Sequence, residues 1–215
     1  MTGNPEDRRS TPIRRLPYKE SHEREHLLEI LRRSRIGHVA IDDGGPVVIP
    51  VAVAYWRDAT ELLIHGSTAS RLFKRLSEGV PACISLTILE GLVLARSGFE
   101  SSMHYKSLIA FGSARRLEGS EKEEALLTLT EHLLPERSKE LRPSTTNELK
   151  ATSILAFPLD DYSIKVSNGE PEDPEEDLAI PIWVGVVPIQ QVFGEPRPVA
   201  DLDPSISIPD YIKRW

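Results

Sequence analysis

The sequence predicts a mainly β protein of the α+β class, an antiparallel barrel or sandwich with a few peripheral helices. Many short apolar runs, rich in β-branched residues, follow one another through tight turns, which favours antiparallel pairing over a doubly wound sheet. Helical spacing is confined to three segments: one near the start, one after His65 and one after Gly119. With 215 residues the chain is long enough for one domain with a real core.

Bulk composition limits the function classes. A formal net charge of -7 argues against general nucleic-acid binding, although a local basic patch could still hold a small anion. No apolar run reaches the roughly 20 residues that cross a bilayer. The polar, proline-rich start lacks the apolar centre of a signal peptide. We therefore expect a cytoplasmic protein with no membrane or nucleic-acid partner, in which the single cysteine, Cys83, is a packing residue.

The N-terminal region is expected to be a flexible arm followed by a helix. Residues 1–17 are rich in Pro and Arg and have almost no apolar periodicity. Residues 21–34 show amphipathic spacing, with Ser21 as a candidate cap. Within them, His22-Glu-Arg-Glu-His26 matches the zinc-protease pattern. Because it falls in the first turns of a solvated helix and the spacing singles out no third ligand, we predict no metal site there.

The remaining elements are expected in a regular order. A hairpin should include a strand over 46–56, where Pro50 marks a bulge or an edge at which a ligand could reach the backbone. Gly112 should be a bulge or a close approach, and Ser120 should open a capping box for a helix ending at Pro135. An exposed acidic loop is expected over 168–177. The expected strands cover 36–41, 46–56, 62–64, 81–89, 92–97, 104–117, 151–157, 162–166 and 180–187.

The stretch from Thr60 to Leu76 has the form of an anion site. An apolar run ends in small polar residues and then turns basic and helical. Serine hydroxyls, amides at a helix start and the guanidinium of Arg71 could converge on one phosphate. The alternative is a capped connection in which Arg71, Lys74 and Arg75 form a solvated face, and this stretch alone leaves both open.

Four segments in a fixed order resemble a known family. They are Arg35-Ile-Gly-His-Val-Ala40 after the leading helix, the proline-containing Val48-Ile-Pro-Val51, Ile64-His-Gly-Ser-Thr-Ala-Ser-Arg71, and His104-Tyr-Lys-Ser-Leu-Ile-Ala-Phe-Gly-Ser-Ala114. This order resembles the split β-barrel flavoproteins related to pyridoxamine 5'-phosphate oxidase, especially the flavin-nucleotide-binding branch with nitroimidazole-resistance-like proteins. The resemblance covers residues 18–193 and leaves 1–17 as the arm and 194–215 as a proline-rich tail.

The resemblance implies a homodimer that binds FMN in a split barrel, with the flavin site at the subunit interface. It places Ser70 and Arg71 on the flavin phosphate and the backbone of residues 50–53 at the ring edge. The residues after His104 would approach the flavin from the partner subunit. The full implied set is Pro50, Val51, Val53, His65, Gly66, Ser67, Ser70, Arg71, Tyr105, Lys106, Ser107 and Trp183.

Two departures limit what the resemblance implies. Leu72 stands where relatives commonly have lysine, and no histidine follows Trp183, although pyridoxamine phosphate oxidases grip their substrate with a C-terminal arginine and histidine. True pyridoxamine phosphate oxidation is therefore not expected. The main hypothesis is an FMN-dependent oxidoreductase acting on an unknown small molecule, with no side chain identified as catalytic.

The sequence leaves other functions open. The first alternative is a non-catalytic flavin- or haem-binding carrier, for which His38, His65 and His104 are potential axial ligands. A zinc hydrolase built on His22 and His26 ranks third. A serine hydrolase is weaker still, because Gly66-Ser-Thr-Ala-Ser70 lacks the second glycine of a nucleophile elbow.

Overall fold

The structure is a computed structural model that describes residues 13–215. Most of the expected N-terminal arm therefore lies outside the described residues. Among those described, no helix is long and apolar enough to cross a membrane.

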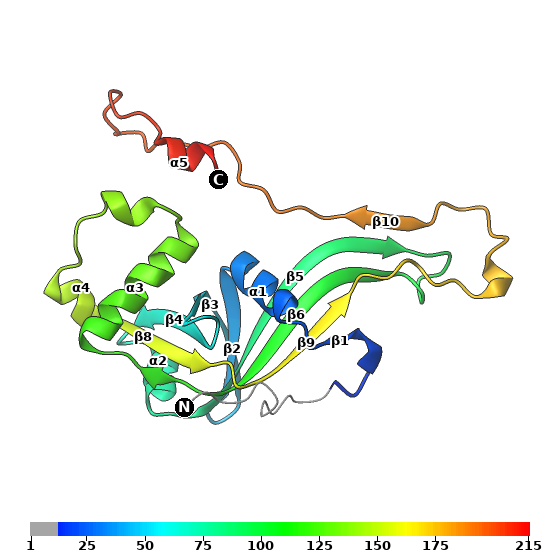
Figure 1. The fold of residues 1–215 in the computed structure, drawn as a ribbon, viewed down its shortest axis with the longest axis horizontal. Helices are drawn as coiled ribbons and strands as arrows, with labels where there is room; N and C mark the ends of the chain where they lie inside the picture. The colour runs from blue at the N-terminus through cyan, green and yellow to red at the C-terminus, as the bar shows by residue number, and fades with distance from the viewer. Residues whose placement is uncertain (1–12) are drawn as a thin grey trace.

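One antiparallel sheet organises the described chain and confirms the predicted mainly β barrel with peripheral helices. Its strand order is β1-β9-β6-β5-β2-β3-β4-β8-β7, and β10 pairs with β5 off this path. Figure 1 shows the sheet curving, with its longest strands running to one end of the molecule. The strands are β1 Glu20–Ser21, β2 Ile36–Asp42, β3 Pro46–Trp56, β4 Glu61–Ser67, β5 Pro81–Leu94, β6 Ser102–Ser113, β7 Arg115–Arg116, β8 Thr152–Pro158, β9 Asp161–Ser167 and β10 Gly185–Pro188.

Strand β3 changes partner along its length. Residues 46–52 pair with β2, whereas residues 53–56 pair with β4. Pro50 lies opposite His38 in the first part, where β4 does not pair with β3. The missing N–H of Pro50 therefore costs no ladder bond on that side, and the prediction of an edge at this position is confirmed.

The core has two parts because β3, β4 and β8 are covered on both faces. One face carries Leu62 and Ile64 into a cluster with residues of α1 and α2. The opposite face carries Leu63 into a second cluster beneath α3. This double covering explains the apolar residues at consecutive positions of these strands. The helices are α1 Arg24–Arg33, α2 Arg71–Ser77, α3 Gly119–Leu133, α4 Thr146–Ala151 and α5 Asp210–Lys213, with short 3-10 turns η2 Pro17–Lys19, η3 Arg137–Glu140 and η4 Glu175–Asp177.

Helix starts differ from the predicted ones. Helix α1 begins at Arg24 after Glu23, and Ser21 belongs to β1 instead of capping the helix, although its Oγ accepts from the Glu23 amide. Helix α3 begins at Gly119 without a side-chain cap. A capping box lies instead between Thr145 and Glu148, at the start of α4.

Strand boundaries also differ. The two strands expected over 81–97 are one strand, β5, which is interrupted by a register shift between Leu89 and Gly91. The strand expected over 104–117 is divided into β6 and β7. Gly112 is a close approach, because a Cβ there would lie 3.0 Å from Pro158 Cγ. Of the strand expected over 180–187, the structure forms only β10.

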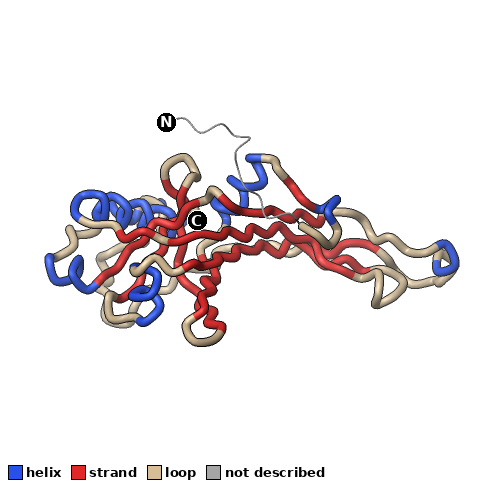
Figure 2. The backbone as a smooth tube through the Cα atoms, turned by 90° about the horizontal axis from the view of Figure 1, so that it is seen from below, coloured by secondary structure: helices blue, strands red, loops and turns tan. Residues whose placement is uncertain are grey.

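The C-terminal region leaves the sheet and returns to the helical end. After β10 the chain continues without helix or strand through residues 189–209, here called the C-terminal arm, turns at residues 199–206, and ends in α5. Figures 1 and 2 show this path from the strand-rich end back toward α3. Tyr211 is buried, and its hydroxyl donates to Glu140 at 2.7 Å. The tail therefore docks on η3.

Candidate functional site

The strand–turn–helix from β4 to α2 is held by tight packing and by its own hydrogen bonds. Gly66 lies against the ring of Phe73, which leaves no room for a side chain. Ser67 Oγ accepts from the Ala69 amide at 3.1 Å, and Thr68 Oγ1 donates to the Ala151 carbonyl at 3.2 Å. The Ser67 hydroxyl is therefore used within the turn and that of Thr68 ties the turn to α4, whereas Ser70 makes no side-chain cap bond.

Arg71 is the exposed cation of this turn. Its side chain is 77% exposed and forms an ion pair with Asp43 from the β2–β3 turn. Nη2 also donates to the Asp43 carbonyl at 3.1 Å, and Arg75 Nε lies 3.0 Å from Asp43 Oδ1. Exposed ion pairs contribute at most about 1 kcal/mol. Because Arg71 remains largely exposed, its guanidinium stays accessible to a second anion.

Leu72 has a structural explanation. It is 4% exposed and belongs to the main core cluster, together with Phe73 and Leu76. A lysine at this position would have to leave its charge in the core, which is rarely tolerated. Lys74 is exposed and forms no ion pair among the described residues, so it is the additional cation available to this turn.

The predicted ring-edge segment on β3 offers less backbone than expected. Pro50 is exposed, but Val51 and Val53 are core residues. The Val53 amide donates to the Arg35 carbonyl at 3.1 Å and is therefore already occupied.

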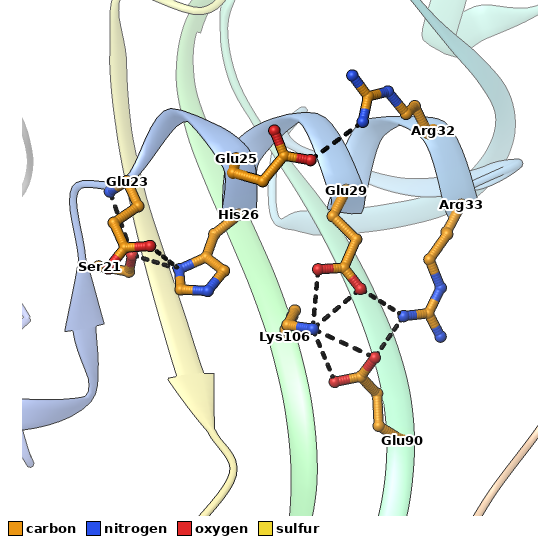
Figure 3. A network of polar contacts seen from close by, with 9 residues as sticks. All are labelled: Ser21, Glu23, Glu25, His26, Glu29, Arg32, Arg33, Glu90 and Lys106. Carbon is orange, nitrogen blue, oxygen red and sulfur yellow. Dashed lines mark hydrogen bonds and ion pairs between the residues drawn. The ribbon is translucent and has the colours of Figure 1, made fainter.

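The β6 motif lies between β5 and β9, where Tyr105, Lys106 and Ser107 pair on both sides. Lys106 Nζ lies 2.9 Å from Glu29 and 3.1 Å from Glu90. Burial opposes the charge on Lys106, but the hydrogen bonds to these two carboxylates outweigh it, so the pKa of Lys106 is raised. Figure 3 shows Arg33 completing the network. Lys106 therefore ties α1 to the sheet.

The predicted residues do not all meet within one chain. Figure 1 shows α2 and β10 at opposite ends of the molecule. Trp183 precedes β10, is 65% exposed and lies against Gly185. The predicted contribution of the β6 motif and Trp183 to the β4–α2 turn thus requires a second chain or a ligand that spans the distance.

The histidines fall into distinct environments. His26 Nδ1 lies 2.7 Å from Ser21 Oγ, and within residues 13–215 no group of three His, Cys, Asp or Glu side chains could hold a metal ion. His104 Nε2 lies 2.8 Å from the Gly169 carbonyl, and His38 is exposed. His65 is half-buried, has no hydrogen-bond partner among the described residues, and has a pKa lowered by burial.

Two cavities that the sequence reasoning missed adjoin the helical end. One, of about 570 Å³, lies between β3 and α3 and includes Tyr55 and His132 in its lining. The other, of about 640 Å³, lies between β5 and the C-terminal arm and includes Leu89 and Phe193. Arg32 and Arg35 line both cavities. The sequence signal for these cavities was the cluster of arginines at 32, 33 and 35. Such a cluster is equally typical of a solvent-exposed helix end, so it could not predict a cavity.

Known proteins resemble this chain in sequence and in fold. The family model described as pyridoxamine 5'-phosphate oxidase matches residues 23–166. The FAD and haem binding protein from Mycobacterium smegmatis is 40% identical, with a TM-score of 0.86 over 91% of this chain and 96% of that one. The flavocytochrome Anf3 from Azotobacter vinelandii is 31% identical, with a TM-score of 0.86 over 94% of each chain.

A more distant structure shares the fold. A 5-nitroimidazole antibiotic resistance protein from Bacteroides thetaiotaomicron, described as such on a provisional basis, is 20% identical, with a TM-score of 0.56 over 68% of this chain and 86% of that one. No curated protein matches. On the family model and the two full-length relatives, this chain belongs to the split-barrel family related to pyridoxamine 5'-phosphate oxidase.

Proposed function

We propose that this protein binds a flavin nucleotide and uses it to pass electrons between a reduced donor and a small acceptor. The observation that carries the proposal is Arg71, a guanidinium that stays 77% exposed although it pairs with Asp43, at the turn where the family resemblance places the flavin phosphate. Support comes from the two full-length relatives, one an FAD and haem binding protein and the other a flavocytochrome. The resemblance implies FMN, but the first relative binds FAD, so FAD is the alternative flavin for this chain.

The chain would supply binding and a controlled environment. A flavin provides the two-electron chemistry itself when it is bound. Arg71 matches a phosphate with its planar fork and stays charged at any working pH. The Ser70 hydroxyl makes no side-chain cap bond and can serve the same anion. Helix α2 has only seven residues, so the charge of Arg71 outweighs any contribution from the helix field.

The test is direct titration of the purified protein with FMN and with FAD. We expect quenching of flavin fluorescence on binding, and affinity at least about tenfold weaker in Arg71→Ala, because a charge-assisted hydrogen bond is lost. Arg142→Ala, which removes an exposed arginine that pairs with Glu148, is the matched control and should bind as the wild type does. Unchanged affinity in Arg71→Ala would return the turn to a simple capped connection.

Two further measurements settle the finer points. Mass spectrometry of the flavin released from the isolated protein separates FMN, FAD and a deazaflavin. Oxidation of a reduced nicotinamide donor separates an enzyme from a carrier, because a carrier would bind flavin without turnover.

We also propose a homodimer in which the sheets of two chains pack against each other through the face that carries Ile36 of β2 and Val48 of β3. Several apolar side chains on this face remain exposed, including Ile36 at 60% and Val48 at 62%. An apolar sheet face of this kind is typical of an interaction surface. Light scattering should give twice the chain mass, and Val48→Glu should shift it toward one chain mass. A wild-type protein that is monomeric at micromolar concentration would contradict this proposal.

Haem is a second candidate cofactor, and His65 is the observation that favours it. Among the three histidines considered from sequence, it alone combines partial burial, a lowered pKa and a ring without a partner among the described residues. A neutral imidazole is the form that ligates a metal. Added haemin should give a sharp Soret band in the wild type and in His38→Ala, and a shifted or lost band in His65→Ala. An unchanged band in His65→Ala would exclude this residue as the ligand.

A further inference from the structure

The wall beside the C-terminal arm holds polar atoms that lack partners. Within residues 13–215, three buried side-chain polar atoms make no hydrogen bond: Ser34 Oγ, Arg35 Nε and Trp215 Nε1. Ser34 and Arg35 are consecutive and both line the larger cavity. Trp215 packs against Phe193 of the same lining, with ring centroids 5.9 Å apart. Because buried polar groups are nearly always satisfied, unpaired atoms gathered at one cavity indicate a missing partner.

Of the three arginines that line this cavity, two have carboxylate partners within the described part of the chain and one does not. Arg32 pairs with Glu25 at 3.1 Å, and Arg33 pairs with Glu29 and with Glu90. Arg35 forms no ion pair among the described residues. Within residues 13–215, the lining of the larger cavity includes no carboxylate, and Glu131, which lines the neighbouring cavity with Arg35, already accepts from the amides of Glu136 and Ser138. An anion would therefore satisfy both the charge of Arg35 and its unpaired Nε.

The backbone and the arm hold Arg35 in place. Its carbonyl accepts from Val53 in the sheet, and its guanidinium lies over the ring of Phe193, 5.2 Å from the centroid. This distance is within the range of a cation–π contact, about 6 Å. The Ser34 carbonyl lies 2.7 Å from His132 Nε2, so the neighbouring residue is fixed as well. A cation held in this way is already positioned for a ligand.

The remaining lining indicates the body of that ligand. The larger cavity combines Phe193 with branched apolar side chains from β5 and the arm. Its volume of about 640 Å³ falls within the roughly 300–1,000 Å³ of small-molecule and cofactor sites. The apolar lining residues are Ile36, Ile88, Leu89, Ile189, Val192 and Phe193.

We propose that the cavity between β5 and the C-terminal arm binds a planar aromatic anion, whose carboxylate or phosphate pairs with Arg35 and whose ring lies against Phe193. None of the described lining residues of this cavity belongs to the β4–α2 turn, so the proposal does not depend on flavin binding there. The arm, held by β10 at one end and by α5 at the other, forms its outer wall.

The test uses 2-naphthoate and its neutral isostere 2-naphthamide as probes, titrated calorimetrically into the full chain with and without saturating FMN. The wild type should bind the acid at least about tenfold more tightly than the amide, because only the acid satisfies Arg35. Arg35→Gln should remove this preference and weaken acid binding about tenfold. Arg32→Gln is the matched control, because Arg32 lines the same cavity but is already neutralised; it should change affinity by less than about twofold.

The outcomes separate this site from the flavin site. Equal affinity for acid and amide, unchanged binding in a folded Arg35→Gln, or no binding by the wild type at millimolar probe would each overturn the proposal. Competition between FMN and 2-naphthoate would also overturn it, by making Arg35 part of the flavin site. Phe193→Leu changes an exposed side chain and should weaken the acid several-fold with thermal stability kept. Failure of FMN to bind while 2-naphthoate binds normally would affect only the proposed flavin function.

Discussion

At the residue scale, Gly66 shows how closely the β4–α2 turn is packed against the core. A Cβ at this position would overlap the ring of Phe73, whose Cζ would lie 2.9 Å away, and Phe73 is 4% exposed. Gly66→Ala should therefore lower the free energy of unfolding by about 1–3 kcal/mol, as overpacking does, measured by urea denaturation. Gly98→Ala has nothing within 4 Å of its new Cβ and should stay within about 0.5 kcal/mol.

A double variant separates the clash from a backbone effect. Phe73→Leu makes space beside residue 66, so adding Gly66→Ala to it should cost much less than adding it to the wild type. An equal cost in both backgrounds would show that the glycine is needed for another reason.

The same scale shows what sequence could reveal about the candidate site. Arg71 was identifiable, because a basic residue directly follows small polar residues at a strand end. The occupation of Arg71 by Asp43, 28 positions away in sequence, depends on the β2–β3 turn meeting α2 and has no local signal. Lys106 was expected near the flavin, yet Glu29 from α1 and Glu90 from β5 hold it. Arg35 was missed because only tertiary packing brings the C-terminal arm to it.

At the element scale, the loop between β9 and β10 corrects the expectation of a uniformly exposed acidic segment. The Asp173 side chain is 2% exposed and pairs with Arg96 at 2.8 Å, and it also accepts from the Arg96 amide at 2.7 Å. Charged hydrogen bonds are worth roughly 1.5–3 kcal/mol each. The sequence shows six acidic residues in this loop. It does not show which of them is buried, because that depends on where β5 ends.

Asp173→Ala should release this loop. Both contacts to Arg96 disappear, so unfolding free energy should fall by about 3–6 kcal/mol, and amide exchange of Arg96 should accelerate well before global unfolding. Glu172→Ala changes the exposed neighbour and should leave both measurements unchanged. A slow Arg96 amide in folded Asp173→Ala would show that the loop is held by other contacts.

Element types were more predictable than element limits. Apolar spacing identified the hairpin, the helix after Gly119 and the strands that pair in order, because burial on one or both faces leaves a periodic trace. The single long β5 was read as two strands because Glu90 and Gly91 interrupt its pattern, and the interruption is a register shift within one ladder. The capping box at Thr145 was overlooked because the six-residue α4 is too short to show periodicity.

At the scale of the whole molecule, acid should destabilise the fold through a shared set of groups. The hydrogen bond from Lys106 holds the pKa of Glu29 below 4.5, and for Glu90 the bonds from Arg33 and Lys106 outweigh burial and lower its pKa as well. Burial lowers the pKa of His65 and of His132 below 6.5. Each group binds its proton less readily in the folded chain, so each contributes stability at neutral pH that is lost as pH falls.

The acid limb of the stability curve can be assigned by substitution. In the wild type, unfolding free energy should begin to fall below about pH 6.5, as the histidines are forced to protonate, and more steeply from about pH 5 as the carboxylates follow. Glu29→Gln/Glu90→Gln should be less stable at pH 7 yet show a shallower slope below pH 5, because two groups with lowered pKa no longer titrate. Glu124→Gln alters an exposed residue of α3 without an ion pair among the described residues, and should keep the wild-type slope. Equal slopes in the double variant and the wild type would mean that the Lys106 network does not carry the acid limb, leaving His65, His132 and the remaining paired carboxylates to account for it.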